Sequence, residues 1–277
     1  MIDNALAKRN VAVLVAAQAF CETAGAHFLS PFDDADVIEG QASVAVEMLE
    51  QLGGAPDLLV VPVGGGGLSA GMLSHLRAVG TVPEIRYVEP LGGASLAAAL
   101  AAGKPVTLPS LDNFVDGAAV ARIGARCFDV LRQVPPQHVL RVPEGRVCVT
   151  IQEMLNLEGI VLEPAGALSI DALRDLGPEV AGRRVVCVAT GGNFDFERLP
   201  DVKERAMRFA GTKKYYVLRM PQRPGALRDF LEVLGPKDDV ARFEYLKKST
   251  RNVGTVLIGI ESPDPGGFDG LQDRMAG

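Results

Sequence analysis

Four consecutive glycines, Gly64 to Gly67, constrain the fold of this chain more than any other feature of its sequence. They directly follow the apolar run 58–63 and precede residues 68–73, which have the character of a helix start. In this order of strand, loop and helix, bare backbone N–H groups can approach a phosphate at the positive end of the helix, and any Cβ would obstruct them. The run predicts a bound phosphorylated small molecule. A tight turn without a ligand is the alternative, although one glycine would suffice for it.

Unbroken apolar strands alternate with helices over the first 210 residues, which predicts a mainly parallel α/β sheet covered on both faces. Strands are expected at 26–30, 58–63, 85–88, 139–142 and 184–189, and helices at 5–24, 37–52, 69–79, 94–102, 118–132, 147–157, 164–176 and 197–210. The last strand enters a second glycine loop, 190–193. Because ligands bind at the carboxyl ends of such strands, we expect the two glycine loops to form one site.

The composition changes after residue 210, where strands rich in aromatic and branched residues begin. Strands are expected at 214–220, 240–246 and 253–260, and helices at 224–234 and 268–275. The order β-α-β-β-α is a ferredoxin-like plan without its last strand. We therefore predict two domains, at 1–210 and 211–277.

Composition excludes several classes of function. A net charge of −6 without a basic stripe, 5% aromatic residues and no Trp argue against nucleic acid as a partner. The four scattered cysteines predict reduced thiols in a cytoplasmic protein, and the three isolated histidines predict no metal site. We interpret residues 5–24 as a helix that ends at Gly25, not as a signal peptide, and expect no membrane span.

Several segments of the first domain together resemble threonine dehydratase, the pyridoxal-phosphate-dependent threonine ammonia-lyase of isoleucine biosynthesis. They are residues 31–34, 37–41, 62–68, 163–167 and 190–194. Residues 214–218 and 221–227 are similar to the ACT-like regulatory domain of that family. The resemblance covers nearly the whole chain. It implies the fold-type-II fold of the tryptophan synthase β type, and a β-elimination that converts L-threonine to 2-oxobutanoate and ammonia.

The resemblance also implies roles for matched residues. The cofactor phosphate would bind the loop formed by Gly64, Gly65, Gly66, Gly67 and Leu68. Thr190 stands where the family has Ser, whose hydroxyl forms a hydrogen bond with the pyridine nitrogen, and a Thr hydroxyl can do the same. A neutral hydroxyl there would leave the ring nitrogen unprotonated, which suits β-elimination because that reaction needs a weaker electron sink than transamination.

Three acidic residues near these motifs have competing interpretations. Asp33 and Asp34 are expected to be turn and capping residues, not catalytic ones. Glu163 is either a site residue or an acid favoured at a helix N-terminus, before Pro164 at the first helical position. The sequence leaves both interpretations of Glu163 open.

The family's chemistry needs a lysine that forms a Schiff base with the cofactor, in a Ser-Phe-Lys type motif that this chain lacks. A Schiff-base amine must be desolvated, whereas all eight lysines here have polar neighbours. They are Lys8, Lys104, Lys203, Lys213, Lys214, Lys237, Lys247 and Lys248. We therefore expect no catalytic residue in the chain, and expect the chain to be the rear portion of a threonine dehydratase that is inactive alone.

Two other functions remain open from the sequence. Residues 65–70 satisfy G-x-G-x-x-A and Glu89 ends the next strand, as in a NAD(P)-dependent oxidoreductase. A non-catalytic amino-acid-sensing protein would instead bind isoleucine or valine at its ACT-like domain. The family resemblance further implies an amino-acid substrate and a homo-oligomer.

Overall fold

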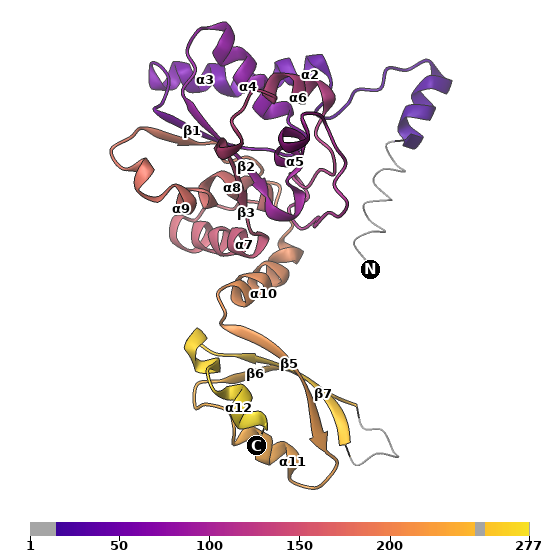
Figure 1. The fold of residues 1–277 in the computed structure, drawn as a ribbon, viewed down its shortest axis with the longest axis vertical. Helices are drawn as coiled ribbons and strands as arrows, with labels where there is room; N and C mark the ends of the chain where they lie inside the picture. The colour runs from indigo at the N-terminus through magenta and orange to yellow at the C-terminus, as the bar shows by residue number, and fades with distance from the viewer. Residues whose placement is uncertain (1–14, 247–252, 277) are drawn as a thin grey trace. The chain divides into compact units, whose positions relative to one another are not determined.

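The structure is a computed structural model that describes residues 15–246 and 253–276. The chain divides between Phe196 and Glu197 into two compact units. Among the described residues of the first unit, a four-stranded sheet has the order β3-β2-β1-β4, and every neighbouring pair is parallel (Figure 1). Its strands are β1 (Leu58–Pro62), β2 (Glu84–Pro90), β3 (Val139–Val142) and β4 (Val185–Cys187). The predicted parallel α/β sheet is confirmed.

Two helices precede β1, and the others lie between consecutive strands, as parallel pairing requires. They are α2 (Ala35–Gln41), α3 (Ser43–Leu52), α4 (Gly67–Ala78), α5 (Ser95–Ala102), α6 (Ala125–Leu131), α7 (Glu144–Glu153), α8 (Pro164–Asp171) and α9 (Leu173–Leu176). Residues 15–24 are also helical, and the rest of the helix expected at 5–24 lies outside the described residues. A π-helical turn, Met154–Glu158, extends α7.

The centre of the sheet is buried on both faces. All five residues of β1 are buried, and side chains alternate between the faces of a strand. Leu59 and Val61 pack in one cluster with Leu73 of α4 and Leu131 of α6. Helix α8 contacts β1, β2 and α7. The burial of the whole of β1 explains why its sequence is an unbroken apolar run.

Four predicted elements are wrong in this unit. The helix expected at 164–176 is two helices, α8 and α9, which meet at Ala172. Residues 26–30 form no strand. The helix expected at 37–52 is two helices, α2 and α3, because the chain turns at Ala42, whose backbone lies against Gly71 of α4. The helix expected at 118–132 begins only at Ala125, since residues 118–124 form a loop instead.

In the second unit, the described residues form an antiparallel sheet of order β5-β7-β6 (Figure 1). The strands are β5 (Lys213–Pro221), β6 (Asp239–Leu246) and β7 (Val253–Glu261), and the helices are α10 (Leu199–Phe209), α11 (Ala226–Leu231) and α12 (Leu271–Ala276). Val256, Ile258 and Ile260 of β7 form a core with Met220 and Phe268. The predicted β-α-β-β-α order is present.

Candidate functional site

The glycine loop follows the carboxyl end of β1 and leads into α4. Gly66 precedes the helix with φ 98°, a left-handed conformation that favours glycine. The hydroxyl of Ser69 donates to the carbonyl oxygen of Pro62 over 3.1 Å, and both residues are buried. This bond fixes the first turn of α4 to the end of the strand, so the loop between them has a defined shape.

Close packing inside the protein is one reason for the run of glycines. A Cβ on Gly65 would lie 2.1 Å from the ring of Phe32, and one on Gly67 would lie 2.9 Å from the carbonyl oxygen of Phe32. A Cβ on Gly64 would lie 2.9 Å from the Cα of Ala118. A Cβ in this loop is therefore excluded by the chain's own atoms as well as by the approach of a phosphate that the sequence predicts.

The backbone N–H groups of this loop are suited to an anion. Gly65, Gly66 and Gly67 are buried, yet the N–H groups of residues 64–68 donate no hydrogen bond to any described part of the chain. Buried N–H groups in proteins are nearly always paired. Together with the N-terminus of α4, which carries partial positive charge, they fit the phosphate of the predicted cofactor.

The second glycine loop lies beside the first, because β4 pairs with β1 and the N–H of Val188 donates to the carbonyl oxygen of Val60 over 2.9 Å. Thr190, the other predicted cofactor residue, is half-buried. A Cβ on Gly166 of α8 would lie 1.7 Å from the carbonyl oxygen of Thr190. The structure thus brings the two predicted loops to one edge of the sheet.

Glu163 lies between these loops, immediately before α8. Its N–H donates to the carbonyl oxygen of Gly191 over 3.0 Å. Its Oε1 would be 2.1 Å from a Cβ on Gly191 and 3.1 Å from one on Gly117. Gly117 in turn contacts Gly64. The sequence left the role of Glu163 open, and it missed Gly117, although a glycine before two alanines was a signal of close packing.

Asp33 and Asp34 are both capping residues, as predicted. The carboxylate of Asp33 accepts hydrogen bonds from the N–H groups of Ala125, Arg126 and Cys127 at the start of α6, over 2.9, 2.9 and 3.2 Å. Asp34 precedes α2 and accepts from the N–H of Asp36 over 3.0 Å. The two adjacent carboxylates therefore serve different helices.

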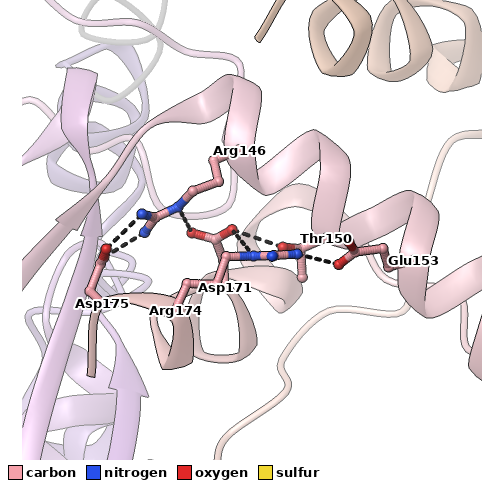
Figure 2. Close-up of polar contacts among 6 residues, drawn as sticks. All are labelled: Arg146, Thr150, Glu153, Asp171, Arg174 and Asp175. Atoms are coloured by element: carbon pink, nitrogen blue, oxygen red, sulfur yellow. Dashed lines mark hydrogen bonds and ion pairs between the residues drawn. The ribbon is translucent and has the colours of Figure 1, made fainter. Parts of the chain in front are cut away.

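A partly buried ionic network joins α7 to α8 and α9 (Figure 2). Nε of Arg146 donates to fully buried Asp171 over 2.8 Å, and the hydroxyl of Thr150 donates to the same carboxylate over 2.8 Å. Hydrogen bonds to Asp175, and then to Asp171, raise the pKa of Arg146. The sequence does not reveal this network. Arg146 and Asp171 are 25 positions apart, and no pattern in the sequence marks them as partners.

Glu89 does not have the role that the oxidoreductase hypothesis requires. Its side chain is fully buried, and its two oxygens accept hydrogen bonds from the N–H groups of Leu96 and Ala97 in α5, over 2.6 and 2.9 Å. Burial raises the pKa of Glu89 to about 7, although these N–H donors oppose the shift. A carboxylate enclosed in a helix N-terminus is not available to a ribose.

No lysine approaches the glycine loops within the described part of the first unit, where Lys104 is the single lysine and is exposed beyond α5. Lys213 of β5 forms ion pairs with Glu204 and Glu261 over 2.6 and 2.9 Å. Lys8, Lys247 and Lys248 lie outside the described residues.

The described residues contain no cluster of three His, Cys, Asp or Glu side chains that is arranged to hold a metal ion. No helix among the described residues has the length and apolar character of a membrane span.

Residues 6–191 match the family described as "Pyridoxal-phosphate dependent enzyme", and residues 204–277 match the "C-terminal regulatory domain of Threonine dehydratase". The chain is 45% identical over 256 residues to "L-threonine dehydratase biosynthetic IlvA" of Bacillus subtilis, covering 92% of this chain and 60% of the relative. The protein of the same name from Mycobacterium tuberculosis is 47% identical over 256 residues, with 92% and 59% covered. The chain thus spans only about three fifths of the length of these relatives.

Solved structures give the same picture. The processed form of threonine deaminase isoform 2 from Solanum lycopersicum is similar with a TM-score of 0.64 and 31% identity, over 69% of this chain and 56% of that one. Maize serine racemase is similar with a TM-score of 0.59 and 28% identity, over 69% and 60%. The two glycine loops described above therefore lie in a fold that pyridoxal-phosphate enzymes share.

Proposed function

The chain belongs to the pyridoxal-phosphate-dependent enzyme family, and on that premise we propose that it is the phosphate-binding and regulatory part of a biosynthetic L-threonine dehydratase. The reaction is the β-elimination of L-threonine to 2-oxobutanoate and ammonia, in isoleucine biosynthesis. The observation that carries the proposal is the row of loop N–H groups at residues 64–68, buried at 65–67, which have no acceptor among the described residues. The match of residues 204–277 favours a dehydratase over a racemase.

In this proposal each loop holds a different part of the cofactor. The N–H groups of residues 64–68 and the N-terminus of α4 bind the phosphate. The hydroxyl of Thr190 forms a hydrogen bond with the pyridine nitrogen. The side chain of Glu163 packs against Gly191 and so supports the second loop. When bound, pyridoxal phosphate supplies the electron sink that allows the hydroxyl group of the substrate to leave.

The Schiff-base lysine is not supplied by the described residues. Lys104 is exposed, and Lys213 is neutralised by two carboxylates in the other unit. Burial lowers the pKa of the Lys213 amine, but the hydrogen bonds that Lys213 donates to Glu204 and Glu261, together with the charge of Glu204, raise it by more in total. The amine therefore stays protonated and is a poor nucleophile. We propose that the 277-residue chain binds the cofactor but does not turn over threonine alone.

The second unit is proposed to bind an amino-acid effector, isoleucine or valine, as the regulatory-domain match supports. We also propose that the protein works as a homo-oligomer in the cytoplasm. Calorimetry with isoleucine, valine and, as a control, alanine tests the effector. Equal heats for all three amino acids would contradict the proposed selectivity.

The enzymatic proposal is tested by reconstitution. The purified chain is mixed with pyridoxal phosphate and L-threonine, with and without the part of the Bacillus subtilis relative that the chain does not cover. We expect 2-oxobutanoate only from the reconstituted pair. Turnover by the chain alone would contradict the assignment of its lysines, and failure of a folded, associated pair to consume threonine would contradict the dehydratase.

A further inference from the structure

We propose that Asp33 is a positioning residue for phosphate recognition, which acts by clamping the back of the glycine loop. This inference rests on the proposed function, because it concerns how the same site is held in shape. Residues 64–68 donate no hydrogen bond to the described chain, so their N–H groups have no internal partner that sets their direction. The hydrogen bond from Ser69 to Pro62 fixes the two ends of the loop, and contacts behind it fix its middle.

Asp33 joins two segments that are more than 90 positions apart in sequence. Its Oδ2 accepts from the N–H of Ala125, and its Oδ1 accepts from the N–H groups of Arg126 and Cys127. A Cβ on Gly124 would lie 2.3 Å from Oδ1 of Asp33, so the start of α6 is in direct contact with this carboxylate. Three N–H donors on one carboxylate hold the segment 31–34 firmly against α6.

Both joined segments touch the loop. From one side, the ring of Phe32 covers Gly65, and the carbonyl oxygen of Phe32 meets Gly67. From the other side, the N–H of Gly124 donates to the carbonyl oxygen of Gly65 over 3.1 Å. The loop is thus held between Phe32 and the start of α6, and Asp33 is the link between the two.

Cys127 closes the arrangement. Its thiol donates to the carbonyl oxygen of Phe32 over 3.0 Å, and its Cβ would lie 2.8 Å from a Cβ on Gly66. Burial, with a contribution from Asp33, raises the pKa of Cys127 to about 12, so the thiol remains a donor at neutral pH. Gly65, Gly66 and Gly67 are therefore each contacted by the group of residues that Asp33 holds together.

This arrangement predicts an effect on phosphate binding that a merely stabilising cap would not have. The probes are pyridoxine 5′-phosphate and pyridoxine, which differ only in the phosphate and form no Schiff base. The dissociation constant of pyridoxine divided by that of pyridoxine 5′-phosphate measures how much the phosphate contributes to binding. Loss of folded protein lowers both affinities equally and leaves this ratio unchanged. We expect Asp33→Ala to reduce this ratio about tenfold, as the loss of one charge-assisted hydrogen bond would.

Asp34→Ala is the matched control. It also removes a helix-capping carboxylate, but the carboxylate of Asp34 caps α2, whereas that of Asp33 contacts α6. We expect Asp34→Ala to lower thermal stability less than Asp33→Ala, because Asp34 accepts from one N–H group and Asp33 from three, and we expect it to leave the phosphate ratio unchanged. Asp33→Asn and Asp34→Asn are measured in parallel, because Asn keeps one acceptor oxygen and is the milder change if Asp33→Ala does not fold.

The outcomes separate the inference from the proposed function. Calorimetry on the 277-residue chain, with folding checked by circular dichroism, gives the ratio for each variant. A chain without substitutions that does not prefer the phosphorylated probe overturns the phosphate site and the inference with it. A clear preference that survives in the folded Asp33 variants overturns the inference alone. A reduced ratio in these variants, beside an unchanged one in the Asp34 variants, supports it.

Discussion

At Gly65 a single methyl group decides whether the loop can keep its shape. In Gly65→Ala the new Cβ would lie 2.1 Å from the ring of Phe32, which real Cβ atoms essentially never do. Because the ring or the loop must move, we expect the substitution to cost roughly 1–3 kcal/mol of unfolding free energy and to abolish the preference for pyridoxine 5′-phosphate. Urea unfolding and probe titration measure the two effects.

Gly40→Ala is the control for this substitution. Gly40 lies in α2, and a Cβ there would meet nothing within 4 Å. Alanine is the better helix former, so we expect a gain of about 0.5–1 kcal/mol and unchanged probe binding. An equal loss of binding in both variants would show that the packing of Gly65 has no special role.

Glu89 gives the stability of the first unit a specific pH dependence. Burial raises the pKa of Glu89 from the ordinary 4.5 to about 7 in the folded chain. Between these values the folded state binds more protons than the unfolded state, so stability falls as the pH rises from about 4.5 to 7. We expect Glu89→Gln to flatten this part of the profile, since the amide cannot ionise. Urea unfolding at intervals from pH 5 to pH 8 measures it.

The same substitution also costs stability at low pH. A Gln amide can accept from one of the two N–H groups that Glu89 serves, at Leu96 and Ala97, but its NH₂ group cannot accept from the other. The expected result is therefore a lower and flatter profile. A profile parallel to that of the unsubstituted chain would contradict the assignment of this pH dependence to Glu89.

At the scale of elements, the network of Figure 2 holds α8 in place, and α8 begins at the site with Pro164. Asp171→Ala would leave the half-buried guanidinium of Arg146 without one partner and Thr150 without its acceptor. Arg146 keeps its pair with Asp175, so the cost is that of lost hydrogen bonds to a buried charged acceptor, and we expect a loss of about 2–3 kcal/mol. Chemical unfolding followed by circular dichroism measures this loss.

Glu153→Gln tests the exposed end of the same network. Glu153 pairs with Arg174, and their side chains are 45% and 43% exposed. Solvent screens such pairs, so we expect a change of about 0–1 kcal/mol. Equal losses in the two variants would contradict the distinction between the buried and the exposed parts of the network.

Strands were easier to predict than helices, for a physical reason. A strand buried on both faces, such as β1, needs an apolar residue at every position, and that run is visible in the sequence. Residues 118–124 are also rich in small apolar side chains, but Ala118 and Ile123 pack against the glycine loop instead of forming a helix. Their burial depends on contacts with Gly64 and Gly66, which local periodicity does not record.

In the whole molecule, the site residues that the sequence could indicate are those whose position follows from the parallel sheet. Gly64 to Gly67 and Thr190 stand in loops whose position follows from the parallel sheet, so their meeting at one edge was predictable. The contacts of Asp33 with α6 and of Arg146 with Asp171 join distant segments through single side chains. Such pairs have no sequence pattern, because only the folded chain brings them together.

Each unit has a hydrophobic core of its own, one around Leu59 and Val61 and the other around Ile258 and Ile260. The chain divides beside Phe196, whose side chain is 63% exposed. We therefore expect limited chymotrypsin digestion to cut after Phe196 and to yield two fragments that each keep their circular dichroism, because a cut between cores removes few contacts from either. Isoleucine, the proposed effector, is expected to slow further digestion of the C-terminal fragment but not of the N-terminal one, because a ligand stabilises only the folded unit that binds it. Prompt degradation of one fragment as soon as the other is released would show that its core is not sufficient.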